Sequence, residues 1–592
     1  MPSKVERWKD ETYGMEVRDH LLQFAEEGWD AIPEDEHDAW FERFKWWGLY
    51  HQRKGQESYF MMRIGTPMGR MTPEQLRTVG EVAKKYATGP VENPEFGDAY
   101  ADFTTRQSIQ LHWINVEDIA DIWDELESVG LSTIQACGDS WRNIVGSPVA
   151  GRDADELIDV WPVVQELHET FKGNDLYSNL PRKWKVAMTG DRRGSGQGDI
   201  NDLAFEPAVK ELEGEEVAGF NVNVGGGLSR KEPRFARDID VFCRPENAAD
   251  VAAGMSALFR DYGDREDRFN ARIKFLVDEW GPEKIRSVLQ EEYMDYELPT
   301  AGQGLRDEYD YNAGRSDSHG DYVGVHDQSD GQNFVGLYVT VGRMGAEDVI
   351  DLADLAEEYG SEMIGLTQRQ NVIVGDIADE DLDDFLAEDL LDEHSPDPHP
   401  FMRGSIACTG TEYCSLSIVE TKNRMVRYGR WLRDNVSLPE GVDDFHIHLS
   451  GCTASCAQPQ IADISLRGMK TRKDGDAVEA FDIGLGGGLG ENPTFADWVK
   501  MRVPADEVPG YIANLLDAFE QERESPEQSF RDFVAERDED ALAALAESEE
   551  TSYEDPYLGN TKMTWYPYAE DTAMDASPAP TDGQGEPLPS DD

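Results

Sequence analysis

The sequence predicts an α+β fold made of two copies of one unit, related by a pseudo-two-fold axis. Short strand patterns alternate with amphipathic helix patterns, as is typical of layered α+β domains. Two landmarks also recur at nearly one spacing. Arg106-Gln-Ser-Ile returns after 263 residues as Arg369-Gln-Asn-Val, and Gly225-Gly-Gly-Leu returns after 261 as Gly486-Gly-Gly-Leu. A repeat of this length indicates a duplicated unit.

A third landmark separates the two copies chemically. The stretch Thr189-Gly-x4-Ser-Gly-Gln aligns, again after 261 residues, with Ser450-Gly-x4-Cys-Ala-Gln. Asp191 and Ser195 occupy the places that Cys452 and Cys456 take in the second copy. Only the second copy therefore carries the cysteines.

The elements in chain order suggest seven segments. Aromatic helical periodicity comes first, and a strand pattern begins at Tyr59. Thr72-Pro is typical of a helix start. Glycine, aspartate and serine then dominate a linker, and the last residues are acidic and later rich in proline and serine. The predicted segments are a helical cap (1–57), a small α+β layer (58–131), a larger α+β unit (132–300), a linker (301–333), a second small layer (334–398), a second larger unit (399–535) and an acidic, disordered tail (536–592).

Composition limits the function. The chain has 592 residues, room for about three to five domains, and 120 acidic against 55 basic residues give a net charge of −65. Such a chain lacks the basic face that binding to nucleic acid needs. Fourteen tryptophans argue for a folded protein, which we expect in a very salty cytoplasm where ions screen its charge. No apolar window is long enough to span a membrane, so we expect a soluble cytoplasmic protein.

Four of the six cysteines cluster in two pairs. Cys408 and Cys414 have the spacing C-x5-C, and Cys452 and Cys456 have the spacing C-x3-C. In a long chain with no sign of secretion, such clustering predicts a metal site. The C-x5-C spacing lies outside the habit of zinc sites. Four thiolates suit a four-iron or a two-iron cluster.

These cysteine motifs identify a family resemblance. C-x5-C, then Gly-Cys452-x3-Cys456-x-Gln and Ile461-Ala-Asp-Ile, resembles the sirohaem-dependent nitrite and sulfite reductases, most of all the haloarchaeal ferredoxin-dependent assimilatory nitrite reductases. This chain has Thr453 and Ala454 where that family usually has Pro and Asn. The resemblance implies two ferredoxin-like half-domains (58–131 and 334–398) and two sirohaem- and cluster-binding α+β domains (132–300 and 399–535). Sirohaem and a [4Fe–4S] cluster would lie at their junction.

Basic residues gather in a few strand or turn segments, although the chain has few of them. An anionic cofactor and an anionic substrate both need cationic donors. By resemblance, Arg63, Arg142, Lys183 and Lys185 match the residues that bind the substrate anion. Arg106 and Gln110 match positions that contact sirohaem carboxylates. Cys408, Cys414, Cys452 and Cys456 match the cluster ligands, with Cys456 bridging to the sirohaem iron.

The resemblance implies six-electron reduction of nitrite to ammonium, with electrons from reduced ferredoxin. Reduction of sulfite to sulfide in the same pocket is the main alternative. Lys185 resembles the sulfite reductases, whereas Trp184 and Arg142-Asn-x-Val-Gly-x-Pro resemble the nitrite reductases, and we favour nitrite. Tyr59 and Cys137 match a pair that is cross-linked in some relatives. A third hypothesis, from another class, is an interaction protein whose four clustered cysteines hold a structural zinc ion.

Overall fold

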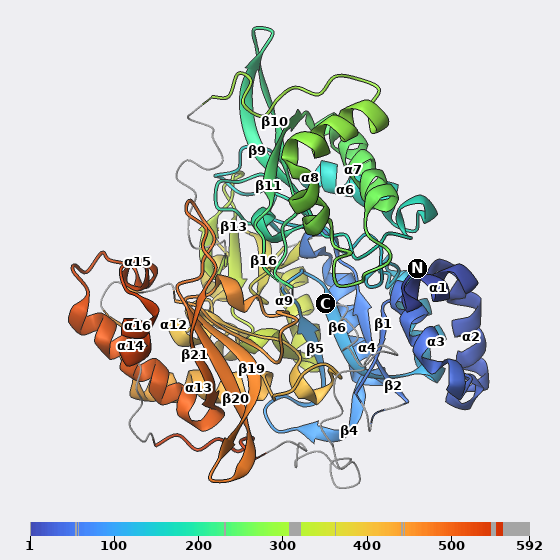
Figure 1. Cartoon of the computed structure of the whole chain (residues 1–592). Coiled ribbons are helices and arrows are strands. Elements are labelled where there is room, and N and C mark those ends of the chain that lie inside the picture. Colours follow the sequence, from blue (N-terminus) through green and yellow to red (C-terminus); the bar gives the residue numbers. More distant parts are fainter. Residues whose placement is uncertain are drawn as a thin grey trace.

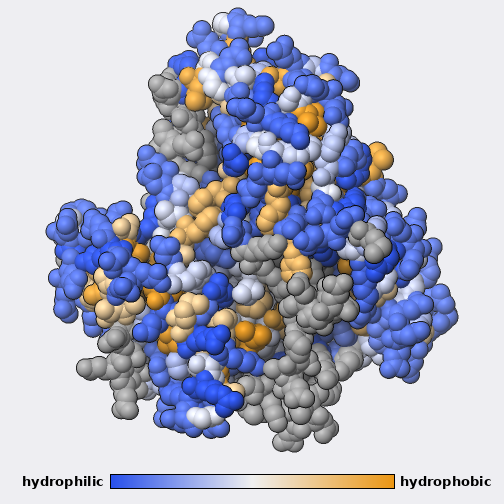
Figure 2. Space-filling view, in the orientation of Figure 1, coloured by the Kyte–Doolittle hydropathy of each residue, from blue (hydrophilic) through white to orange (hydrophobic). Residues whose placement is uncertain are grey.

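The computed structural model describes residues 2–559, except 54–55, 57, 230–231, 307–320, 361–362, 440–441, 443–444 and 546–551. Four β-sheets form its frame, and helices cover them (Figure 1). The visible face is largely hydrophilic, with hydrophobic residues gathered mainly toward its centre (Figure 2). No helix among the described residues is both long and apolar enough to cross a membrane.

Three helices form the N-terminal region: α1 (Lys4–Glu11), α2 (Arg18–Glu27) and α3 (His37–Phe44). They lie at one side of the molecule, shown dark blue at the right of Figure 1. Their buried aromatic side chains include Phe24, Trp40 and Phe44, which join the core of the neighbouring sheets. Burial of such large side chains contributes about 1.5–3 kcal/mol each. The predicted cap is thus helical up to Trp47, where a 3₁₀ turn follows α3, and the strand β1 comes next within the same segment.

The two small layers exchange short strands. The first sheet has the order β1-β2-β6-β5-β14, with β4 beside β5, and the second has the order β12-β13-β16-β15-β3. Strand β3 from the first layer therefore ends the second sheet, and β14 from the second layer ends the first. Helices α4 and α9 pack on each other, and both layers share one hydrophobic core. The elements are β1 (Leu49–His51), β2 (Tyr59–Ile64), β3 (Arg70–Met71), α4 (Pro73–Tyr86), β4 (Thr88–Asn93), β5 (Gly97–Phe103), β6 (Ile109–Asn115), α5 (Ile119–Ser128), β12 (Gly324–Asp327), β13 (Asn333–Leu337), β14 (Arg343–Gly345), α9 (Ala346–Glu358), β15 (Ile364–Leu366), β16 (Val372–Ile377), α10 (Leu382–Phe385) and α11 (Leu390–Glu393).

The two larger units have matching sheets. One has the order β11-β10-β9-β8-β7 and the other β17-β18-β19-β20-β21. In each sheet, the first three strands along the chain pair in parallel, and the last three pair antiparallel. The elements are β7 (Val145–Gly146), α6 (Trp161–Phe171), β8 (Val186–Met188), β9 (Leu203–Leu212), β10 (Glu215–Val224), β11 (Arg237–Cys243), α7 (Ala248–Tyr262), α8 (Ile273–Val288), α12 (Pro400–Arg403), β17 (Ser405–Ala407), α13 (Lys422–Asn435), β18 (Ile447–Ser450), β19 (Ile464–Lys473), β20 (Asp476–Leu485), β21 (Asp497–Pro504), α14 (Val508–Glu522), α15 (Phe530–Ala535) and α16 (Glu539–Leu545).

The duplication read from the sequence is present in the fold. Strands β9 and β10 are separated from β19 and β20 by the 261 residues of the repeat. The Gly-Gly-Gly turns also match: a Cβ on Gly226 would lie 2.4 Å from the Asp199 carbonyl oxygen, and one on Gly487 would lie 2.4 Å from that of Gln460. These glycines therefore let two backbone segments of one unit pass closely, which explains why both copies keep them.

Two segment boundaries differ from the expectation. Strand β12 begins at Gly324, inside the expected linker, because a regular antiparallel pairing with β13 satisfies its backbone despite a polar sequence. The expected disordered tail contains α16 and a further packed segment. There Asp555 forms a 2.8 Å ion pair with Arg424, whose side chain is fully buried. Tyr553 and Tyr557 are buried around it. Residues 307–320 of the linker and the tail beyond 559 lie outside the described residues.

Candidate functional site

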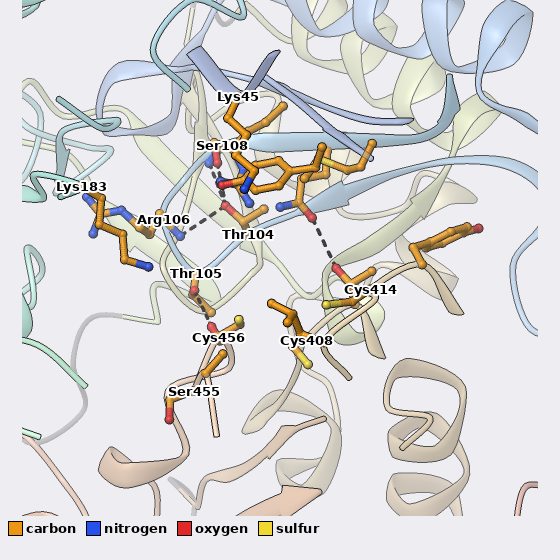
Figure 3. A pocket seen from close by; sticks show the side chains of 18 of the residues that line it. Lys45, Thr104, Thr105, Arg106, Ser108, Lys183, Cys408, Cys414, Ser455 and Cys456 are labelled. Atoms are coloured by element: carbon orange, nitrogen blue, oxygen red, sulfur yellow. Dashed lines mark hydrogen bonds between the residues drawn. The ribbon is translucent and has the colours of Figure 1, made fainter. Parts of the chain in front are cut away.

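One cavity of about 390 Å³ collects the predicted site residues. It is lined from both small layers, both larger units and the N-terminal helices. Figure 3 shows Lys183 and Arg106 at its left, and Cys456, Cys408 and Cys414 at its lower centre and right. The cavity lining includes all ten predicted residues: Arg63, Arg106, Gln110, Arg142, Lys183, Lys185, Cys408, Cys414, Cys452 and Cys456.

Strand topology brings the two cysteine pairs together. Cys408 directly follows β17, and Cys452 lies two residues after β18. These strands are neighbours and run parallel. Because parallel strands end at the same edge of a sheet, the two loops leave the sheet side by side. Pairs that are distant in sequence therefore line one wall.

The surroundings of the thiols fit an iron–sulfur cluster. The backbone N–H of Gly451 donates to Cys408 Sγ (3.1 Å), and that of Ala454 donates to Cys452 Sγ (3.5 Å). Hydrogen bonds to sulfur are among the features that set the potentials of such clusters. Among the described residues, no three His, Cys, Asp or Glu side chains converge closely enough to hold one metal ion. Four thiols that line one cavity are a ligand set suited to an iron–sulfur cluster.

The cations reach the cavity from the opposite side. Arg63 lies on β2 and Gln110 on β6, where the two residues are paired across the strands. With its amide oxygen turned toward the guanidinium, Gln110 accepts from Arg63 Nε (3.1 Å). Arg142 and Lys185 precede the parallel strands β7 and β8, so their loops meet at the amino end of that sheet.

Arg106 is clamped at the centre of the site. Its Nη1 donates to Asn201 Oδ1 and its Nη2 to the Asn143 carbonyl oxygen, each at 2.7 Å. The neighbouring Thr105 hydroxyl donates to the carbonyl oxygen of Cys456 (3.0 Å; Figure 3). One turn of the first layer thus joins the cationic side of the cavity to the cysteine side.

Several cations lie close together around the cavity and lower one another's pKa. Burial, then the charges of Arg142, Arg272 and Arg63, lower the pKa of Arg106 to about 9, against the opposing charge of Asp202. Burial, then Arg106 and Arg272, holds the pKa of Lys185 well below the usual lysine range. Cations that lie close together depress one another's pKa in this way. The cavity therefore fits a polyanionic ligand.

The sequence interpretation missed several lining residues. Arg272 forms a 2.7 Å ion pair with Asp202, whose other carboxylate oxygen accepts from the backbone N–H of Lys185 (2.9 Å). Asp202 belongs to the repeat and its position could have pointed to this role. Asn143 follows Arg142, and its side chain donates to the carbonyl oxygens of Thr66, Arg106 and Gln107 (2.8–3.0 Å). The helical region also contributes Lys45.

The buried carboxylate of Asp139 holds together the loops that carry Arg142 and Lys183. Asp139 is fully buried and pairs with Arg268 (2.7 Å), Lys9 (3.2 Å) and Arg182 (3.4 Å). Its backbone carbonyl oxygen accepts from Leu180 N (2.9 Å), which ties the Arg142 loop to the Lys183 loop. The three cations hold the pKa of Asp139 well below its usual range, against the effect of burial.

Replacing Asp139 by asparagine should destabilise the protein. We expect a loss of about 3–5 kcal/mol, because the change leaves three buried cations without their carboxylate. Urea unfolding at high KCl measures the loss, with Asp124→Asn on the exposed side of α5 as the matched control. An equal, small effect in both variants would show that Asp139 does not organise these loops.

Tyr59 and Cys137, which match a cross-linked pair in some relatives, have different neighbours in the structure. Tyr59 begins β2, and its ring packs edge-on against Trp113 (5.0 Å between centroids). Cys137 Sγ instead lies 3.4 Å from Nη1 of Arg63, four residues or about 13 Å further along β2. The tyrosine ring that packs on Arg63 is that of Tyr50 (5.2 Å). The structure therefore gives no support to a Tyr59–Cys137 cross-link.

Comparisons with known proteins agree over nearly the whole chain. The model "nitrite and sulphite reductase 4Fe-4S domain" matches residues 137–298 and 399–552. The model "nitrite/sulfite reductase ferredoxin-like half domain" matches 51–92, 94–129 and 326–388. The two ranges of the 4Fe-4S domain model correspond to the two larger units. The range 399–552 contains all four clustered cysteines.

Individual relatives cover the chain equally well. An assimilatory ferredoxin-dependent nitrite reductase of Haloferax mediterranei is 54% identical, over 96% of this chain and 98% of its own. A ferredoxin-type sulfite reductase of Mycolicibacterium paratuberculosis is 34% identical, over 89% of this chain and 94% of its own. The structure of the Mycobacterium tuberculosis NirA protein superposes with a TM-score of 0.81 and 32% identity, covering 92% of this chain and 98% of that one.

Proposed function

Since the chain belongs to the nitrite and sulfite reductase family, with that family's sirohaem and [4Fe–4S] cofactors, we propose that it reduces nitrite to ammonium with electrons from ferredoxin. One observation carries the proposal: ten residues, four thiols and six cationic or amide side chains, line a single cavity. Identity is also higher with the nitrite reductase of Haloferax than with the mycobacterial sulfite reductase. We propose the cytoplasm as its location, because clustered cysteines that bind a metal cluster instead of forming disulfides suit a reducing compartment.

The chain's own residues divide between cofactors and substrate. Cys408, Cys414, Cys452 and Cys456 would hold the cluster, with Cys456 shared with the sirohaem iron. Arg106 and Gln110 would bind sirohaem carboxylates, for which guanidinium forks are suited. When bound, these cofactors would supply the electrons and the iron chemistry that reduction of the anion needs.

The remaining cations would act on the substrate. Arg63, Arg142, Lys183 and Lys185 would bind the anion, orient it and hold protons at their nitrogen atoms as N–O bonds break. Lys183 and Arg142 are at most 7% exposed, so their charges act in a medium of low polarity. Oxygen atoms leave as water, and each needs protons that this cluster of N–H groups can deliver.

Spectroscopy of the purified holoenzyme tests the proposal. We expect sirohaem absorption bands, and iron sufficient for one [4Fe–4S] cluster and one sirohaem per chain. When the enzyme is given reduced ferredoxin and nitrite, it should produce ammonium. Colourless protein that binds one zinc ion would contradict the proposal and support the structural zinc site instead.

The pH dependence should report Lys185. Its lowered pKa means that it loses its proton at lower pH than an ordinary lysine. Because the anion needs the protonated form, kcat/KM for nitrite should fall as the pH rises through that pKa. Lys185→Gln should lower kcat/KM on the acid side of that pKa and remove this decline. An unchanged alkaline decline in the variant would assign it to another group.

Sulfite is the second candidate, and Lys185 is the observation that favours it. By resemblance a lysine at this position is typical of sulfite reductases. Its half-buried place in the cavity, near Arg106 and Arg272, would suit a more highly charged anion. Both anions would use the same residues, so the two hypotheses differ in substrate preference alone.

A further inference from the structure

The loop from Cys408 to Cys414 is held by a buried charge network from outside its own domain. Glu412, two residues before Cys414, is 1% exposed. One of its carboxylate oxygens accepts from Arg343 Nη1 (2.7 Å). The other accepts from Asn93 Nδ2 (2.8 Å) and from the Tyr100 hydroxyl (3.0 Å). Glu412 thus anchors the loop to both small layers.

Arg343 links this carboxylate to a second one. Its Nε and Nη2 donate to the two oxygens of Asp102 at 2.7 and 2.9 Å. Asp102 also bonds His112 (3.0 Å) and lies 3.8 Å from Lys422 Nζ. Arg343 is on β14, the strand that the second layer contributes to the first sheet. The strand exchange therefore places this guanidinium between the two carboxylates.

Further contacts hold the Cys408–Cys414 loop in place. The Tyr413 ring stacks on His112, with centroids 3.9 Å apart and ring planes 9° apart. Its backbone carbonyl oxygen accepts from Arg53 N (3.0 Å), and that of Glu412 accepts from Gln56 Nε2 (2.9 Å). Both the backbone and the side chains between the cysteines are therefore fixed.

The network also reaches the cavity. Asp102, His112, Tyr413 and Lys422 line it together with Cys408 and Cys414. Burial, opposed by Asp102, lowers the pKa of His112, which leaves this imidazole neutral. Two carboxylates then face two cations, Arg343 and Lys422. Each charge lies in a region of low polarity, where it acts strongly on any charge that changes nearby.

Stability alone gives little reason for such a network. Buried ion pairs cost much in desolvation, and apolar residues of similar volume often stabilise a protein as well. A charge beside an iron–sulfur cluster, in contrast, changes the cluster's potential, because reduction adds a negative charge there. Removing a nearby anion favours reduction, and removing a nearby cation disfavours it.

We propose that Arg343 and Glu412 are positioning residues that fix the Cys408–Cys414 loop and set the reduction potential of the cluster held there. The inference rests on the proposed function, since it requires the cluster. It assigns neither residue a contact with substrate. The two residues have opposite charges, and this provides a test of sign.

The experiment is an EPR-monitored redox titration of the holoenzyme and of the variants Glu412→Gln and Arg343→Gln. We expect the midpoint potential of the cluster to rise in E412Q and to fall in R343Q. In the double variant, which loses one charge of each sign, it should return toward the native value. All three variants should unfold at lower temperature than the native protein.

Arg152→Gln is the matched control. Arg152 makes the same two-pronged pair, with Asp376 (2.6 and 2.9 Å), but neither residue of this pair lines the cavity, whereas Asp102, the partner of Arg343, does. R152Q should lower the unfolding temperature and leave the potential unchanged. The inference would be overturned if the midpoint potential shifted in the same direction in E412Q and R343Q. It would also be overturned if these shifts were no larger than the shift in R152Q. If R343Q does not accumulate, E412Q and R152Q decide the question. A rise of the midpoint potential in E412Q that exceeds the shift in R152Q would support the inference, and any other result would overturn it. Native protein without a cluster would instead refute the proposed function.

Discussion

Cys456→Ser should abolish nitrite reduction and prevent assembly of the native cluster. Serine at this position would remove one of four thiolate ligands, and the one that we assign to both cofactors. The first copy shows the same exchange in nature: Ser195 takes the equivalent place, and its hydroxyl donates to Asp191. Iron content, sirohaem absorption and EPR of the purified variant measure the loss.

Cys243→Ser is the control for the loss of a buried thiol. Cys243 is 2% exposed on β11 and belongs to the core of the first larger unit. It should cost stability, roughly 1–3 kcal/mol for a poorly satisfied hydroxyl, and leave cluster and activity intact. A Cys456→Ser protein with native iron content and turnover would refute its assignment as a bridging ligand.

Lys183→Gln should lower kcat for nitrite by about 10²–10³-fold. Removing one preorganised donor that acts on developing charge in a buried site typically has an effect of this size. Lys183 is 2% exposed and lines the cavity. Cofactor content should remain native, since the predicted sirohaem contacts come from Arg106 and Gln110. Steady-state kinetics together with iron analysis separate the two roles.

Lys274→Gln makes the same change at a lysine that does not line the cavity. Lys274 is 1% exposed, and its Nζ donates to the carbonyl oxygen of Glu232 (2.7 Å). We expect its kcat to stay within a few-fold of the native value. If both variants lost activity equally, a general effect of burying glutamine would explain the result better than catalysis by Lys183.

The ten residues that the family resemblance singled out come in short motifs, and this explains their common location, while their roles stay predictions. Cys408, Cys452 and the cations stand directly beside short strands, and the repeat shows which loops of the two copies correspond. Parallel pairing then brings these loops together without any further information from the sequence. All ten predicted residues line the cavity for this reason.

Long-range pairings were harder to predict. Nothing in the periodicity of Arg343–Gly345 indicates that β14 joins the sheet of the other layer, so the link from Arg343 to Asp102 was not foreseen. The contact of Lys9 with Asp139 depends on how the N-terminal helices dock. Asp555 in an acidic tail looks like a solvated charge, but its burial depends on Arg424, far away in sequence.

The most direct test of the central claim compares kcat/KM for nitrite and for sulfite. Both should be measured with one reduced ferredoxin, at high KCl because the protein's charge of −65 needs screening. We predict a clear preference for nitrite, with ammonium as the product. A preference for sulfite, with sulfide as the product, would contradict the proposed function. The fold and the cavity would then serve the other branch of the family.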